Sequence, residues 1–244
     1  MNKLLSFEFR NAFDHLYVKL MPLILLLFGI AGGLLNAADI KANNIEIYPQ
    51  MDELPQFLTM LSEVITLIGG LLLSKDFTQN TIRNKIIIGH SRTKIYLAKQ
   101  IMVTTVYLVN IVLFYAGYAV SNILVLGTDN LSRSGFAKVT VLMLVSYFCF
   151  SLFACFLSMT VKNSLGGALP LLAAYGVLFI SAFREIFRNK ITEYAAEVFP
   201  LGTLMQSAVS MPYPHLLRNC ILMICFSAAS FAAGIAIFRK TDLN

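Results

Sequence analysis

Charged residues are scarce in this chain. Only 13% of its 244 residues are Asp, Glu, Lys or Arg, whereas 57% are hydrophobic, and the mean hydropathy is +0.72. A soluble domain of this size carries roughly 25% charged residues. The shortage of charge excludes an ordinary soluble domain and assigns the chain to the membrane proteins.

Residues for covalent, metal or nucleotide chemistry are also sparse. The four cysteines lie inside apolar runs and form no CxxC pair, which excludes a disulfide framework or a zinc knuckle. The three histidines are scattered, without the spacing of metal ligands. Neither a GxxxxGKS/T loop for ATP phosphates nor an HExxH motif occurs. We therefore expect a protein that is not an enzyme and that binds no metal or cofactor itself.

What the chain has instead is six long apolar runs. A helix needs about 20 mostly apolar residues to cross the roughly 30 Å hydrocarbon core of a bilayer. The runs are continuous and not alternating, which is typical of helices rather than of barrel strands. They cover residues 20–38, 54–74, 100–128, 139–161, 163–183 and 219–238. The sequence predicts an all-α membrane protein with six transmembrane helices in a single domain, residues 1–244.

The distribution of charge predicts the orientation. With both termini in the cytoplasm, the inner segments carry twelve Lys and Arg and four acids, and the outer segments carry seven and eight. Basic residues favour the cytoplasmic side. The net charge of +6 therefore reflects membrane topology, and we do not expect nucleic-acid binding.

Two polar segments flank the predicted spans. Residues 1–19 carry apolar positions at helical spacing, which predicts an amphipathic elbow helix in the headgroup plane; the alternative is a simple cytoplasmic extension of the first span. Pro22 disfavours helix at Met21, so we expect the turn into the first span there. Residues 184–218 predict a helical segment in the outer leaflet between spans five and six, either a lid or a structural cap.

Three features inside the spans are candidates for packing or function. The small residues of 29–33 predict a close helix contact, either within the chain or between two copies. Glu63 is the only ionisable residue deep in a span, where a carboxylate costs roughly 2.5–3.5 kcal/mol. It either lines a cavity and contacts substrate or bonds to a neighbouring polar group. Pro170 interrupts the fifth span and is either a hinge or a static kink.

The stretch 75–99 concentrates basic residues between the second and third spans. It holds six of the nineteen Lys and Arg and only one acid, Asp76. Asp76 or Thr78 can cap the start of a helix, Gly89 suits the left-handed residue that ends one, and Ser91 can cap the next. This pattern predicts a short cytoplasmic helix held between two spans.

This layout resembles the permease subunits of type-2 ABC exporters, the small six-span bacterial kind. That family shows an acid, a small-Thr-apolar-basic step, Gly-x-Ser-Arg and a downstream Lys in the inner loop. The corresponding residues here are Asp76, Asn80-Thr81-Ile82-Arg83, Gly89-His90-Ser91-Arg92 and Lys99. Asn80 departs from the usual Gly, and His90 from the frequent Pro. Phe199-Pro200-Leu201-Gly202 also resembles the family.

The resemblance implies a transport subunit in the bacterial cytoplasmic membrane. Residues 77–89 would be the coupling helix, seated in a groove of a separate ATP-binding-cassette ATPase that binds ATP and Mg. Two permease copies, identical or different, would move amphipathic peptides or hydrophobic toxins and drugs outward between them. The residues implied to couple to the ATPase are Asp76, Phe77, Thr81, Ile82, Arg83, Lys85, Ile86, Gly89, Ser91 and Arg92.

Three other interpretations remain open at this point. The chain has about the number of spans of the membrane substrate-binding subunit of a vitamin importer, which would bind its vitamin tightly in a single copy. An immunity or sensor protein would bind a toxic peptide without moving it. The basic loop itself could be a topogenic element that binds no partner.

Overall fold

The chain is helical wherever its structure is described. The computed structural model describes residues 1–42, 65, 68–77, 79, 81–128, 136–161, 165–182 and 216–240, and these contain no strand. Residues 68–77 are helical. The other helices are α1 (Asn2–Phe13), α2 (Leu16–Ala42), α4 (Thr81–Ile87), α5 (Arg92–Leu126), α7 (Phe136–Thr160), α8 (Leu165–Ala182) and α11 (Leu216–Lys240). The predicted all-α class is confirmed for these residues.

In the described part of the chain, four helices are long and apolar enough to cross a membrane, which indicates a membrane protein. They are Leu16–Ala42, Arg92–Leu126, Thr140–Thr160 and Leu217–Lys240. They coincide with the predicted first, third, fourth and sixth spans. Helix α8 covers the predicted fifth span, whereas most of the predicted second span, residues 54–74, lies outside the described residues, as does nearly all of 184–218. The six-span arrangement therefore stays a prediction.

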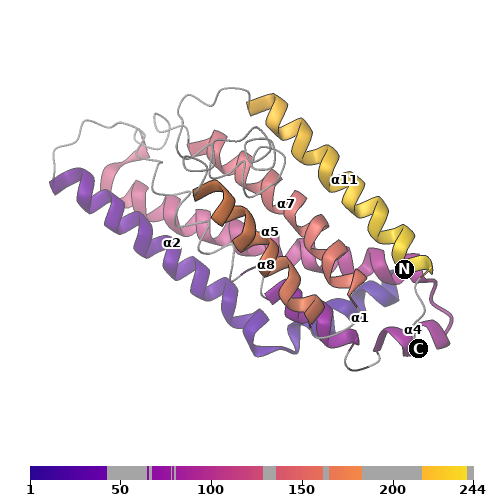
Figure 1. Cartoon of the computed structure of the whole chain (residues 1–244). Coiled ribbons are helices and arrows are strands. Elements are labelled where there is room, and N and C mark those ends of the chain that lie inside the picture. Colours follow the sequence, from indigo (N-terminus) through magenta and orange to yellow (C-terminus); the bar gives the residue numbers. More distant parts are fainter. Residues whose placement is uncertain are drawn as a thin grey trace.

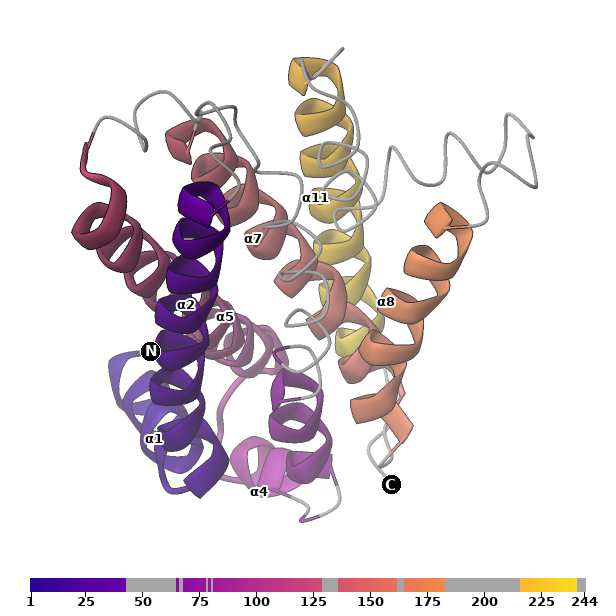
Figure 2. The same ribbon diagram turned by 90° about the vertical axis from the view of Figure 1, so that its left-hand side faces the viewer.

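Helix α5 is the centre of the bundle. It contacts α1, α2, α4, α7 and α11, while α7 also packs against α8 and α11. Helix α2 lies along one side of α5, and α7 and α11 lie along the other (Figure 1). The short helix α4, helix α1 and the C-terminal end of α11 gather at the same end of the bundle (Figure 2). This end is where the predicted cytoplasmic segments meet.

Glycines bring α2 and α5 into backbone contact. A Cβ added at Gly29 or Gly33 would overlap α5, and one added at Gly117 would lie 2.5 Å from a backbone oxygen of α2. The Asn36 side-chain amide donates a hydrogen bond to the Tyr118 hydroxyl across the same contact (2.7 Å). Small residues allow such close approach between membrane helices. The predicted small-residue face therefore packs within the chain.

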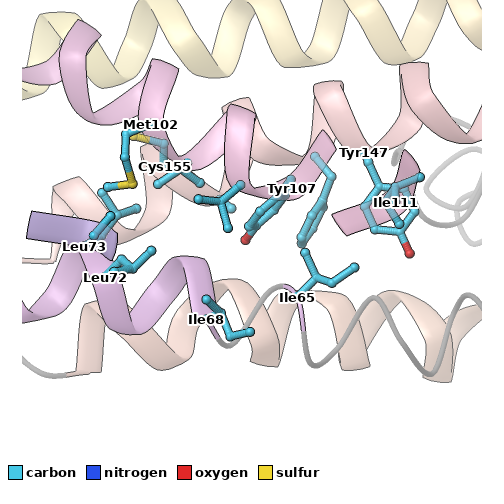
Figure 3. Close-up of a cluster of buried hydrophobic side chains, with 14 of the residues drawn as sticks. Ile65, Ile68, Leu72, Leu73, Met102, Tyr107, Ile111, Tyr147 and Cys155 are labelled. Carbon is cyan, nitrogen blue, oxygen red and sulfur yellow. The ribbon is translucent and has the colours of Figure 1, made fainter. Parts of the chain in front are cut away.

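The helical stretch 68–77 packs against α5 and α7 on one side and against α8 on another. Ile65, Ile68 and Leu72 lie in one buried cluster with Tyr107 of α5 and Tyr147 of α7 (Figure 3). Inside a bilayer this packing is stabilised by van der Waals contacts between the side chains, because lipid tails are as apolar as the side chains themselves. The inner part of the predicted second span is thus fixed against the central helix.

A second close contact joins 68–77 to α8. A Cβ added at Gly167 would lie 2.7 Å from the Ser74 hydroxyl and 2.8 Å from the carbonyl oxygen of Gly70. Pro170 lies inside α8, one turn beyond this contact. The two roles considered for Pro170, a hinge and a static kink, both stay predictions.

The elbow between α1 and α2 does not lie where the sequence predicted it. We expected the helix to run through residues 1–19 and to turn at Met21–Pro22, but α1 ends at Phe13 and α2 begins at Leu16 with Pro22 inside it. The turn occurs at Asp14 and His15, where His15 accepts the first hydrogen bonds of α2 from Val18 and Lys19. Pro22 is the seventh residue of α2, so its missing N–H leaves the Val18 carbonyl without its usual helical donor. Membrane helices tolerate such a proline because neighbouring groups can satisfy the freed carbonyl.

Candidate functional site

The predicted helix-break-cap pattern is present in the basic stretch. Helix α4 covers only Thr81–Ile87, shorter than the expected 77–89, because Phe77 still belongs to the preceding helical stretch. Gly89 has a φ of +100°, a left-handed conformation that glycine adopts without steric cost. The Ser91 hydroxyl accepts a hydrogen bond from the Lys94 amide (3.4 Å) and caps α5. The predictions for Gly89 and Ser91 are confirmed. Asp76, predicted as a possible helix cap, lies instead inside the helical stretch 68–77, and Thr78 lies outside the described residues.

Beneath α4 lies a closed ring of four buried charges, which we call the ion ring: Glu8, Asp76, Lys85 and Lys99. Lys85 Nζ lies 2.5 Å from Glu8 Oε1 and 3.4 Å from Asp76 Oδ2. Lys99 Nζ lies 2.5 Å from Glu8 Oε2 and also pairs with Asp76 Oδ2. Each lysine therefore contacts both acids, and each acid contacts both lysines.

The ion ring joins four separate elements of the chain. Glu8 comes from α1, Asp76 from the end of 68–77, Lys85 from α4 and Lys99 from the second turn of α5. Their relative exposures are 0%, 1%, 5% and 1%, so solvent does not screen the charges. With two acids and two lysines the ring is formally neutral. Electrostatic contacts therefore join the four elements at one point, where water cannot replace them because the side chains are buried.

Two further contacts fix the ring. The Thr81 hydroxyl lies 3.1 Å from both Asp76 Oδ1 and the Asp76 carbonyl oxygen, and donates to this pair. The Phe7 ring lies 5.2 Å from Lys85 Nζ, within the range of a cation–π interaction. Removing one member of a buried ion pair costs about 3–5 kcal/mol because an uncompensated charge remains. The ring therefore holds α4 firmly against α1 and α5.

The opposite face of α4 is exposed and partly apolar. Arg83 and Asn84 are exposed, and Ile87 and Ile88 at its end are 73% and 77% exposed. The site thus combines an anchored inner face with a free outer face. Arg83, Asn84, Ile87 and Ile88 are called the α4 outer face below.

A comparison of the sequence with protein-family models gave one match. Residues 26–244 match the model of a family described as "Protein of unknown function (DUF2705)". The chain belongs to this DUF2705 family. A search of curated proteins found no match. The match begins inside α2 and includes Asp76, Lys85 and Lys99, whereas α1 and Glu8 precede it.

The predicted coupling residues divide into two groups. Asp76, Ile82 and Lys85 are buried, and Phe77 and Ile86 are partly buried against the core. The others lie toward solvent to varying degrees: Thr81, Arg83, Gly89, Ser91 and Arg92. The buried group positions α4, so only part of the predicted set is available to a partner in this structure.

Arg92 also has a role within the chain. Its Nη1 donates a hydrogen bond to the carbonyl oxygen of Arg239 at the end of α11 (3.2 Å). The last carbonyl groups of a helix have no partner within the helix, and a cation there is favoured by the helix dipole. Arg92 therefore ties the start of α5 to the C-terminal end of α11.

Glu8 was not among the predicted site residues, and Lys99 was recognised only as part of the motif. The sequence does contain a signal for Glu8: Leu4, Glu8 and Ala12 are spaced by four residues and form the buried stripe of α1. A carboxylate in such a stripe requires a buried cation. Glu63 lies outside the described residues, so its role stays a prediction. The described part of the chain contains no group of three or more His, Cys, Asp or Glu side chains placed to hold a metal ion.

Proposed function

We propose that the protein is the permease subunit of an ABC exporter, in which a separate ATPase docks on the α4 outer face. The observation that carries this proposal is a short helix anchored on one side and free on the other. A docking element must be firmly attached to the helices that it moves, and it must leave a face for the partner. The anchored ring and the exposed isoleucines meet both requirements.

The α4 outer face has the composition of a protein-binding surface. Exposed isoleucines beside an arginine match the apolar centre and charged rim of protein interfaces, where arginine is frequent. The area of a seven-residue helix is small compared with that of a stable interface. We therefore expect further contacts from neighbouring cytoplasmic segments.

Force would pass from α4 into the membrane through its two covalent neighbours and through the ion ring. Closure of an ATPase dimer on ATP would displace α4, and Asp76 and Lys99 would carry this displacement into 68–77 and α5. The proposed substrates are amphipathic peptides or hydrophobic toxins and drugs, exported between two permease copies. The chain itself would bind neither ATP nor Mg.

The first experiment is affinity purification of the tagged chain from its native membrane, followed by mass spectrometry and an ATPase assay in reconstituted vesicles. We expect an ATP-binding-cassette ATPase to co-purify and its hydrolysis to increase on association with the chain. Ile87→Asp and Arg83→Asp should abolish this increase while leaving the thermal unfolding midpoint unchanged. Lys3→Asp, on the exposed side of α1, is the matched control.

Ile87 is a better probe than Ile86. Ile86 is partly buried against the core, so an aspartate there would disturb packing as well as docking. Wild-type stimulation in both Ile87→Asp and Arg83→Asp would refute the docking surface. Tight binding of a vitamin by the isolated chain would favour an importer subunit, and peptide binding without ATP-dependent efflux would favour an immunity protein.

A further inference from the structure

Helix α1 is far from the coupling region in sequence but contributes a quarter of its anchoring charge. Glu8 and Lys85 are 77 positions apart, yet the two oxygens of the Glu8 carboxylate contact the two lysines of the ring separately. Without Glu8, two buried lysines would share Asp76 alone, and the ring would carry a net positive charge. The pose of α4 therefore depends on a residue that no local motif includes.

A second contact joins the same two regions independently. At the elbow between α1 and α2, His15 Nε2 lies 3.2 Å from Lys75 Nζ, directly before Asp76. Phe7 lies against Lys85 from the same helix. The coupling region is thus contacted by Phe7 and Glu8 in the middle of α1 and by His15 at the elbow that follows it.

We propose that α1 moves with α4 as one body during coupling and that Glu8 is the positioning residue that links them; this inference rests on the proposed function. Separating buried opposite charges is unfavourable because little solvent is present to replace the lost contacts. A displacement of α4 therefore takes α1 along instead of breaking the ring. Helix α1 becomes a moving part of the transporter rather than a static membrane anchor.

The test compares Glu8→Gln, Lys85→Met and the double variant in purified chain and in complex with the co-purifying ATPase. Each single variant should lower the unfolding midpoint by about 10 °C, because it leaves one buried charge unmatched. The double variant retains the neutral Asp76–Lys99 pair, so its midpoint should return to within about 4 °C of wild type. Its ATPase stimulation should nevertheless stay at least about tenfold below wild type, a loss that stability alone does not explain.

A distance measurement keeps the proposal testable if the double variant does not fold. Spin labels on the exposed Ser6 of α1 and on His90, which follows α4 and lies outside the α4 outer face, would be introduced after the native cysteines are replaced by alanine. In the wild-type complex the distance between the labels should be the same with and without ATP. A change on ATP binding would show that α1 and α4 move separately and would overturn the proposal.

The outcomes also separate this inference from the proposed function. If the wild-type chain binds no ATPase, the proposed function fails, and the inference fails with it. If the wild-type chain stimulates an ATPase and the folded double variant stimulates it equally, the exporter assignment stands and the role of Glu8 is refuted. Loss of stimulation in a stable double variant, with a constant label distance in wild type, supports both.

Discussion

The contact between α2 and α5 allows a controlled test of the packing, because one helix carries both a test glycine and its control. A Cβ added at Gly29 would overlap the carbonyl oxygen of Phe114 and lie 3.1 Å from the backbone nitrogen of Tyr118. At Gly32, three residues further along α2, the nearest atom is a side-chain carbon of Tyr118 at 4.0 Å, an ordinary contact distance. Gly29→Ala and Gly32→Ala should therefore have opposite effects.

The magnitude follows from two terms of opposite sign. Replacing a glycine inside a helix by alanine gains about 0.5–1 kcal/mol of helix stability at either position. At Gly29 the obstructing atoms belong to the backbone of α5, which cannot rotate away as a side chain would, and overpacking of this kind costs about 1–3 kcal/mol. Gly32→Ala should be stabilising, and Gly29→Ala should be less stable than it by about 1–3 kcal/mol.

The assay is reversible unfolding of the purified chain in mixed micelles, with the two variants compared at equal detergent composition. Helix propensity is common to both substitutions, so the difference between them reports the packing alone. Equal effects of the same sign, or a larger loss for Gly32→Ala, would refute the backbone contact between α2 and α5.

Three further predictions test other parts of the fold. Gly167→Ala should destabilise the chain by about 1–3 kcal/mol, since its Cβ would meet a backbone oxygen at 2.8 Å, whereas Gly176→Ala, with no atom within 4 Å, should not; thermal unfolding of the pair distinguishes them. Burial and the charge of Lys75 lower the pKa of His15. The contribution of neutral His15 to stability should therefore be complete above about pH 6.5 and be lost as the pH falls. A His15→Gln variant should lack this part of the pH dependence of the unfolding midpoint. Ser91→Ala should cost about 0.5–2 kcal/mol through loss of the α5 cap, and Ser91→Thr should restore most of it in the same assay.

Features that depend on local sequence were predictable. Long apolar runs predicted the positions of four spanning helices, because the apolar length needed to cross a bilayer is visible in the sequence itself. Gly89 and Ser91 predicted the end of one helix and the cap of the next, because backbone conformation and capping depend on one or two residues. The prediction from Pro22 was wrong, because a membrane helix can continue through a proline when neighbouring groups satisfy the freed carbonyl. The elbow lies instead at Asp14 and His15.

The ion ring was not predictable, because its members come from four elements whose contact depends on the tertiary fold. Lys85 shows why. It shares the inward side of α4 with Ile82, yet a lysine in a basic loop is ordinarily assigned to solvent. A charged lysine is stable on a buried face only where carboxylates pair with it. Here the carboxylates belong to Glu8 in α1 and Asp76 in 68–77. The assembly of the ring from distant segments is what hid the site from the sequence. Under the proposed function, the same assembly would let a displacement of α4 reach several helices at once.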